Sequence, residues 1–498
     1  MITNNAYTQL VKLRQQLADI GSAAAVLSWD QEVLMPEGAS ARRARQLATL
    51  AELQHQMTVE QLPTALAAAR EQSGLTHEQQ LNLAQLARDL ERQQKLPGSF
   101  VAELTETTSR AQRVWEGARS RNAFAEFEPW LTKIVELKRR EADYYGYADH
   151  PYDALLDSYE PGVKTAAVTA RFAQLRPRLQ TLLNQVRRRP QVDDSFLHQP
   201  LSQTDQLAFA ADILRAMGYS FQHGRQDLSA HPFCTSFGPE DVRITTRYKE
   251  RDFTFLVYSS IHEGGHALYE QGLNPEQYGM PWGEACSLSI HESQSRLWEN
   301  NVARSLGFWQ HWFPRLQQLM PDGLRGKGPE EVFRAVNRVE PSLIRIEADE
   351  LTYHFHIIIR FELEQALVKG DLQVKDLPAV WNERYRDYLG VQVPGDAQGV
   401  LQDVHWSLGA IGYFATYSLG SLYSAQLLAQ AELDLGSLET KWAAGEFAPL
   451  RSWLQGKIFD HGRLYTSEEL CKLATGRELS IEPFVEYLTR KLTRVYGL

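Results

Sequence analysis

The chain has 498 residues, of which 43% are hydrophobic and 23% are charged, and its formal net charge is −10. This composition is that of an ordinary globular protein with enough apolar residues for a large core. The acidic balance argues against the basic face that a nucleic-acid-binding protein needs.

The N-terminal half is predicted to be almost entirely helical. Residues 7–25 place apolar side chains at helical spacing, and Gln/Leu/Ala/Arg-rich stretches continue to about residue 189. Breaks are expected at residues 35–40, 95–100 and 188–200, where Pro, Gly and Ser or Asp collect. The first residues lack the basic-then-apolar order of a signal peptide. Cys234, Cys286 and Cys471 show no metal-binding spacing, which favours a reducing cytoplasm.

One strand signal interrupts the helices. Residues 231–248 contain two short β-rich runs on either side of GPED, which is typical of a hairpin. Helical patterns resume at Asp252, and the uncharged run at 407–430 reads as a buried helix rather than a membrane span, because it is rich in Ser, Thr, Tyr and Gly. We therefore expect a mainly α protein with one small β-sheet, folded as a single domain over 1–498.

The chemistry is concentrated in HEGGH, from His262 to His266. Two histidines four residues apart lie about 40° apart around a helix, so both imidazoles can reach one ion. The pattern H-E-x-x-H is typical of zinc peptidases, in which the glutamate is the general base. We predict a zinc ion held by His262 and His266, with Glu263 beside it as general base.

The glycine pair inside this predicted helix needs a reason, because each Gly costs about 0.5–1 kcal/mol relative to Ala. Gly264 falls on the face opposite the histidines, so we expect another element to pack there. Gly265 falls on the flank, and we expect it to clear space for substrate backbone beside the metal.

The third metal ligand is not fixed by spacing. A catalytic zinc usually keeps three protein ligands and one open position. A turn after the histidine helix is followed by a second predicted helix, on which Glu284, Glu292 and Glu299 fall near one face. The candidates are Glu270, Glu276, Glu284, His291, Glu292 and Glu299.

Several motifs together resemble the carboxypeptidase Taq family of metallocarboxypeptidases. They run in the family's order from residue 29 to the C-terminus and cover nearly the whole chain. The motifs are WDQEVLMPEGA at 29–39, HPF at 231–233, DVRIT at 241–245, HEGGH at 262–266, HESQS at 291–295, IRIEAD at 344–349, GVLQDVHW at 399–406 and HGRLYT at 461–466.

This resemblance implies the third ligand, the fold and the reaction. It selects Glu292 as the third ligand and implies a large helical zinc-peptidase fold with a deep substrate groove, in which the metal-site part is about 201–498 and a helical part is about 1–200. It also implies release of single residues from peptide C-termini, with broad tolerance. One Zn²⁺ per chain, for which Co²⁺ can substitute, and a homodimer complete the expectation.

Further roles follow from what the reaction requires. The developing oxyanion needs donors beyond the zinc, and His405 and Tyr417 are the candidates, with Tyr413 in reserve; each tyrosine could equally be a core aromatic. An exopeptidase must also bind the terminal carboxylate, for which an arginine fork is suited. Arg345 is the first choice, and its alternative is a structural i,i+4 pair with Asp349.

Arg243 is a weaker substrate-binding candidate, because a charged residue there could simply brace the hairpin. The hairpin itself could align a peptide as an added strand. Asp241, Asp349 and Asp403 are candidates for orienting histidines or arginines.

Two rival functions remain open at this point. An oligopeptidase or dipeptidyl carboxypeptidase could use the same zinc scaffold. A non-catalytic peptide-binding protein is disfavoured by Glu263, because a binder has no need for a general base. In every case we expect peptide partners, no nucleic-acid or membrane partner and a cytoplasmic location.

Overall fold

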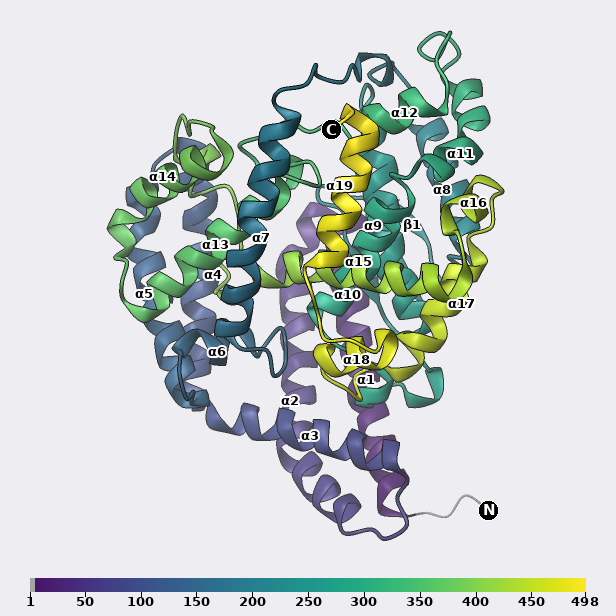
Figure 1. Cartoon of the computed structure of the whole chain (residues 1–498). Helices are drawn as coiled ribbons and strands as arrows, with labels where there is room; N and C mark the ends of the chain where they lie inside the picture. The colour runs from purple at the N-terminus through teal and green to yellow at the C-terminus, as the bar shows by residue number, and fades with distance from the viewer. Residues whose placement is uncertain (1–4) are drawn as a thin grey trace. The chain divides into compact units, whose positions relative to one another are not determined.

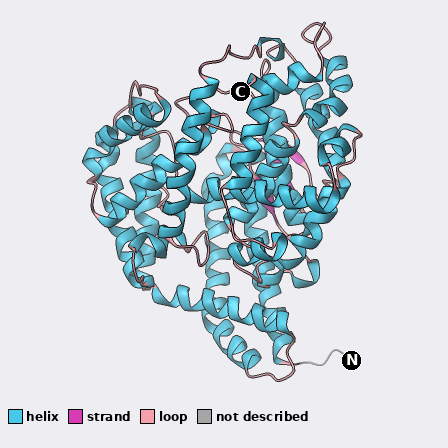
Figure 2. Ribbon diagram, in the orientation of Figure 1, coloured by secondary structure: helices cyan, strands magenta, loops and turns pink. Residues whose placement is uncertain are grey.

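The computed structural model describes residues 5–498, and most of them lie in helices (Figure 1, Figure 2). Within those residues the strands form one three-stranded sheet, shown in magenta in Figure 2. The predicted mainly α class with a small sheet is therefore confirmed. The deep groove stays a prediction.

The chain groups into two compact units, and each unit is assembled from three separated segments. Unit 1 consists of residues 1–90, 193–336 and 427–478. Unit 2 consists of residues 91–192, 337–426 and 479–498. Folding as a single domain over 1–498 stays a prediction.

Unit 1 holds the sheet and the HEGGH helix. Its helices are α1 (Ala6–Val33), α2 (Ser40–Arg70), α8 (Gln203–Met217), α9 (Phe253–Gly272), α10 (Leu288–Arg296), α11 (Leu306–Leu319), α12 (Pro329–Val336), α16 (Leu438–Ala443), α17 (Ala448–Lys457) and α18 (Ser467–Thr475). A π-helix, η5 (Leu297–Val302), continues directly from α10.

Unit 2 is helical and carries the IRIEAD and GVLQDVHW motifs. Its helices are α4 (Gly98–Arg121), α5 (Phe124–Tyr145), α6 (Pro151–Leu156), α7 (Thr165–Val186), α13 (Tyr353–Lys369), α14 (Leu377–Leu389) and α19 (Glu482–Tyr496). Helices α3 (His77–Lys95) and α15 (Ala415–Leu435) contribute residues to both units.

The N-terminal helices form because their apolar residues recur on one face. The helix predicted at 7–25 is confirmed as part of α1, and Asn5 caps it by accepting a hydrogen bond from Thr8 N at 2.9 Å. The breaks expected at 35–40 and 95–100 are also found, since α2 begins at Ser40 and α3 ends at Lys95. The facing apolar side chains form a core cluster that includes Tyr7, Leu10, Leu13, Leu17, Leu62, Leu66, Leu83, Leu86 and Met280.

The predicted hairpin is confirmed, and the sheet has one strand more than expected. Strands β2 (Cys234–Ser236) and β3 (Val242–Thr246) pair in antiparallel fashion, with Thr235 opposite Arg243. The additional strand β1 (Gln226–Leu228) pairs in parallel with β3, so β3 is central. Sequence analysis missed β1 because three residues with no buried face carry no alternation.

The uncharged run at 407–430 is only partly helical. Helix α15 begins at Ala415, and its residues Leu419, Leu422 and Tyr423 are fully buried. The preceding residues cannot join the helix because Gly409 and Gly412 have φ values of +71° and +103°, outside the right-handed helical region. No helix within residues 5–498 has the length and apolarity that a membrane crossing requires.

Candidate active site

Helix α9 presents the HEGGH residues and is buried on nearly every face. Asp252 caps its N-terminus by accepting hydrogen bonds from Thr254 Oγ1 at 2.7 Å and Phe255 N at 3.2 Å. Such an all-round apolar helix is stable only inside a protein, and here α8, α10 and the sheet surround it. Side chains fix the sheet to the helix, since Gln226 donates to Ser260 at 2.6 Å. The histidines therefore project from a rigid element.

The two glycines are contact points for two neighbouring helices. A Cβ on Gly264 would lie 2.3 Å from Leu214 Cδ2 on α8, which confirms that another element packs behind the histidines. A Cβ on Gly265 would lie 2.6 Å from Gln294 O and Ser295 Cα on α10. The expectation that Gly265 clears space for substrate was therefore wrong: the backbone of α10 fills that space.

Helix α10 brings a third group toward the histidines. Ser287 caps it by accepting a hydrogen bond from Ile290 N at 3.2 Å. The predicted second helix thus begins later than Glu284, which precedes α10 and pairs with Arg14 and Arg463 instead. The close approach at Gly265 is what allows Glu292 on α10 to come within reach of both histidines.

Two imidazoles and one carboxylate converge in unit 1. One ligand atom from each of His262, His266 and Glu292 lies within 4.8 Å of the others, and the described part of the chain contains no second group of this kind. Glu292 Oε2 lies 3.8 Å from His262 Nε2 and 3.4 Å from His266 Nε2. Two nitrogen donors and one oxygen donor are the donor set of a catalytic zinc site, so these residues fit a metal ion.

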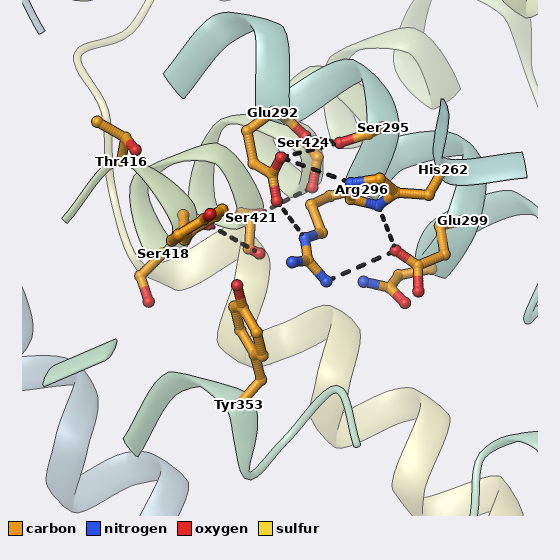
Figure 3. A network of polar contacts seen from close by, with 12 residues as sticks. His262, Glu292, Ser295, Arg296, Glu299, Tyr353, Thr416, Ser418, Ser421 and Ser424 are labelled. Carbon is orange, nitrogen blue, oxygen red and sulfur yellow. Dashed lines mark hydrogen bonds and ion pairs between the residues drawn. The ribbon is translucent and has the colours of Figure 1, made fainter. Parts of the chain in front are cut away.

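Each of the two histidines is oriented through its other ring nitrogen. His262 Nδ1 donates to Glu299 Oε2 at 2.8 Å (Figure 3). His266 Nδ1 contacts His291 Nδ1, and His291 Nε2 donates to Glu270 Oε1 at 2.7 Å. Such partners fix the tautomer and ring orientation of a ligating histidine. In both histidines Nε2 is thereby directed to the metal position.

The charges in this group follow from burial and from close partners. Burial alone would lower the pKa of His262, but Glu292 and Glu299 outweigh it and raise the pKa to about 9. Burial and the neighbouring His291 lower the pKa of His266 to about 4. Glu292 keeps a pKa well below its usual value despite burial, because Arg296 and His262 stabilise its charge.

Glu263 has the opposite shift. Burial raises its pKa to about 7, against the attraction of His262 and with the repulsion of Glu292. The residue is only 8% exposed. A carboxylate whose pKa lies near neutrality is well matched to general base catalysis at neutral pH.

The remaining third-ligand candidates have other partners. Glu270 and His291 pair with each other, and Glu299 holds His262. Glu276 is exposed in a short 3₁₀ helix, η3 (Pro275–Gln277). Sequence analysis missed Arg296, whose Nε donates to Glu292 Oε1 at 2.7 Å. Its position four residues after Glu292 is an i,i+4 signal that could have identified it.

Unit 2 brings together four of the other candidates, Arg345, His405, Tyr413 and Tyr417. His405 Nε2 lies 3.2 Å from Tyr417 OH, and the ring centroids of Tyr413 and Tyr417 are 5.3 Å apart. Arg345 Cζ lies 5.0 Å from the centre of the Tyr417 ring. Burial, together with Arg345, lowers the pKa of His405 to about 4. His405 is therefore neutral at neutral pH.

Arg345 is held by Asp403 rather than by Asp349. Its Nε and Nη2 donate to Asp403 Oδ1 at 3.0 and 2.9 Å, and its Nη1 donates to Tyr353 OH at 3.2 Å. The alternative of an i,i+4 pair with Asp349 was wrong, because Asp349 accepts from Thr352 Oγ1 and from nearby backbone amides. The helical spacing fails here since Arg345 lies in a short 3₁₀ turn.

A buried glutamate fixes the loop that carries His405. Glu364 on α13 accepts hydrogen bonds from Trp406 Nε1 at 2.8 Å and from Gly412 N at 3.0 Å. These two bonds join both sides of the 401–414 segment to one helix. The loop can therefore hold His405 in a defined position without belonging to a regular element.

Arg243 lies in unit 1 and braces the hairpin. Its Nε and Nη2 donate to the two carboxylate oxygens of Asp241 at 2.8 and 2.7 Å. Its Cζ lies 4.5 Å from the centre of the Trp29 ring on α1. A role in bracing the hairpin, the alternative to substrate binding, accounts for these contacts of Arg243.

Two histidines and a glutamate around one position, with Glu263 between the histidines in an H-E-x-x-H helix, are typical of metallopeptidases. The chain belongs to the carboxypeptidase Taq (M32) metallopeptidase family, whose sequence profile matches residues 9–492. It is therefore an enzyme of the metallocarboxypeptidase class, and the family implies a metal ion.

Individual relatives agree over their whole lengths. The chain is 42% identical to thermostable carboxypeptidase 1 of Thermus thermophilus, covering 100% of both chains. It is 36% identical to carboxypeptidase 1 of Bacillus subtilis, covering 98% of both. The crystal structure of an M32 carboxypeptidase from Deinococcus radiodurans matches with a TM-score of 0.97 and 41% identity, covering 99% of this chain and 100% of that one.

Proposed function

We propose that this protein is a zinc-dependent carboxypeptidase that releases single amino acids from peptide C-termini with broad side-chain tolerance. The observation that carries the proposal is the convergence of His262, His266 and Glu292 within 4.8 Å, with the buried carboxyl group of Glu263 on the helix of the two histidines. Membership of the carboxypeptidase Taq family supports the exopeptidase reaction.

Zinc is the proposed metal, with one ion per chain and Co²⁺ as a possible substitute. His262, His266 and Glu292 would hold it, and imidazole donors with one carboxylate suit this ion. When bound, zinc supplies a Lewis acid that polarises the scissile carbonyl and lowers the pKa of water.

Glu263 is proposed to carry the proton. As a carboxylate it accepts a proton from the attacking water, and as a carboxylic acid it then donates that proton to the nitrogen of the leaving amino acid. Burial supports this role. In the metal-free site it raises the pKa of Glu263, which makes Glu263 a stronger base than an exposed glutamate.

His405 and Tyr417 are proposed to donate hydrogen bonds to the oxyanion, with Tyr413 in reserve. The contact between His405 Nε2 and Tyr417 OH at 3.2 Å supports a shared role for these two residues. The lowered pKa of His405 means that it would donate as a neutral imidazole. A neutral donor stabilises a developing negative charge without first binding an anion.

Arg345 is proposed to bind the terminal carboxylate of the peptide. A guanidinium has five N–H donors, and the contacts with Asp403 and Tyr353 use three of them. These contacts hold the side chain in one orientation, so little rotamer entropy is lost on binding. Arg243 is the weaker candidate for the same task, given its bidentate pair with Asp241.

Broad side-chain tolerance is proposed to come from main-chain recognition. A peptide that pairs with a short edge strand is bound through its backbone, which every sequence shares. Both β1 and β2 are edge strands of the sheet beside α9. The enzyme is further proposed to act as a cytoplasmic homodimer on peptides with a free C-terminus.

The decisive experiment is mass spectrometry of a short peptide incubated with the enzyme, with chelated enzyme and with Glu263→Gln. Stepwise loss of single C-terminal residues, absent from both controls and blocked by C-terminal amidation, is the expected result. Internal cleavage or dipeptide release would reassign the enzyme as an oligopeptidase or a dipeptidyl carboxypeptidase. Zinc binding without any cleavage would favour a peptide-binding protein.

A further inference from the structure

Arg296 lies between two carboxylates that both serve the metal group. Its Nε donates to Glu292 Oε1 at 2.7 Å, and its Nη1 lies 3.5 Å from Glu299 Oε2 (Figure 3). All three side chains are largely buried, with exposed fractions of 14% for Arg296, 8% for Glu292 and 14% for Glu299. Ion pairs that are this short and this well shielded from solvent hold their side chains more firmly than exposed surface ion pairs do.

The contact with Glu292 divides the two oxygens of that carboxylate. Oε1 is taken by Arg296, whereas Oε2 accepts from Ser295 Oγ at 3.2 Å and faces His262 and His266 at 3.8 and 3.4 Å. A carboxylate that is free to rotate could offer either oxygen, or both, to an ion. Arg296 thus leaves Oε2 as the oxygen that points to the metal position.

The contact with Glu299 links the second ligand to the same guanidinium. Glu299 Oε2 accepts from His262 Nδ1 at 2.8 Å. A continuous chain of polar contacts therefore runs from one metal ligand, Glu292, through Arg296 and Glu299 to another ligand, His262. The π-helix that follows α10 carries Glu299, and such irregular turns are frequent at functional sites.

We propose that Arg296 is a positioning residue that reserves Oε2 of Glu292 for the metal ion and locks this ligand to the Glu299–His262 pair. The proposal rests on the proposed metal site but concerns metal binding alone. Partners of metal ligands change metal affinity by about 10- to 100-fold when they are removed. A merely structural ion pair would change stability and leave the metal environment unaltered.

Two variants separate geometry from charge. Arg296→Lys keeps the positive charge but lacks the planar fork that reaches two carboxylates. Arg296→Gln removes the charge and keeps a possible donor to Glu292. The matched control is Arg463→Lys, because Arg463 is similarly buried, with 17% of its side chain exposed, and its Nη2 lies 2.7 Å from carboxylate oxygens of both Glu284 and Asp89, which are outside the metal group.

The measurement is Zn²⁺ affinity of the metal-free proteins by chelator competition, together with the visible absorption of the Co²⁺ forms. We expect both Arg296 variants to lose about tenfold or more in affinity and to change the Co²⁺ spectrum, which reports coordination number and geometry. Arg463→Lys is expected to stay within about threefold of the parent with an unaltered spectrum, because its partners do not touch a metal ligand.

Unchanged affinity and an unchanged Co²⁺ spectrum in Arg296→Lys would overturn the proposal, and this variant decides the matter if Arg296→Gln does not fold. An Arg296 variant with a raised KM for peptides but parental metal binding would also overturn it, by assigning Arg296 to the substrate. Peptide cleavage by the parent enzyme is scored separately, so a failure of the proposed carboxypeptidase reaction is distinguishable from a failure of this assignment.

Discussion

Gly265 on α9 and Ser295 on α10 approach so closely that a methyl group on Gly265 would lie 2.6 Å from Ser295 Cα. A methyl group on the neighbouring Gly264 would instead lie 2.3 Å from Cδ2, at the end of the Leu214 side chain. A side-chain tip can rotate away, whereas the backbone of a packed helix cannot. The two glycines therefore predict different responses to the same substitution.

Gly265→Ala is expected to displace α10 and with it Glu292, so that zinc binding weakens about tenfold or more and peptide cleavage falls accordingly. Gly264→Ala is the matched control, with a cost of about 1–3 kcal/mol from overpacking against Leu214 and near-parental zinc affinity. Thermal unfolding and chelator competition measure the two effects. Equal zinc affinities in the two variants would contradict the packing argument.

Glu263→Gln is expected to reduce kcat by about 10²–10⁴-fold while zinc affinity stays within a few-fold, because the amide has the same shape but cannot accept the proton. Steady-state kinetics and metal analysis of the same preparation provide the comparison. Glu276→Gln, at an exposed position of the short 3₁₀ helix η3, is the control and should retain parental kinetics. A Glu263→Gln enzyme with parental kcat would remove Glu263 from the reaction.

Zinc binding is expected to release about one proton near neutral pH. The metal-free site holds His262 protonated, since burial is outweighed by Glu292 and Glu299 and the pKa is raised to about 9. His266, whose pKa is lowered to about 4, is already neutral. As pH falls below about 9, the proton therefore competes more strongly for His262 and zinc affinity decreases.

Calorimetric titration in buffers of different ionisation enthalpy measures this proton count. Glu299→Gln removes one of the carboxylates that stabilise the charged imidazole, so its proton release should be smaller than that of the parent. Proton release that is absent from the parent at neutral pH would show that His262 is neutral before the metal arrives.

Arg345→Lys is expected to lower kcat/KM for peptides with a free C-terminus by about 10- to 100-fold, since a charged hydrogen bond contributes about 1.5–3 kcal/mol. The loss should appear mainly in KM, and zinc affinity should not change. Arg243→Lys serves as the comparison because its partners are Asp241 and Trp29. If Arg243→Lys shows the larger rise in KM, the two arginines have exchanged roles.

Much of this protein could be predicted from local patterns. Apolar periodicity indicated the helical class, the GPED turn indicated the β2–β3 hairpin, and the four-residue spacing of His262 and His266 indicated a metal pair. These signals are readable because each depends on residues that are neighbours along one element. The third ligand was not local in this sense: spacing left Glu292 among six candidates, and family resemblance selected it.

Tertiary packing decided the rest. The occupant of the space beside Gly265 is the backbone of a helix that begins more than twenty residues later. The partner of Arg345 is Asp403 rather than the nearby Asp349. The i,i+4 spacing indicates the pair of Arg296 with Glu292, whereas the second contact of Arg296, with Glu299, depends on the π-helix that continues α10. Sequence alone determined which chemical groups the chain carries and which of them share a helix face, because that periodicity is local. Which groups meet across elements depends on how buried surfaces fit together, and only the folded structure fixes that fit.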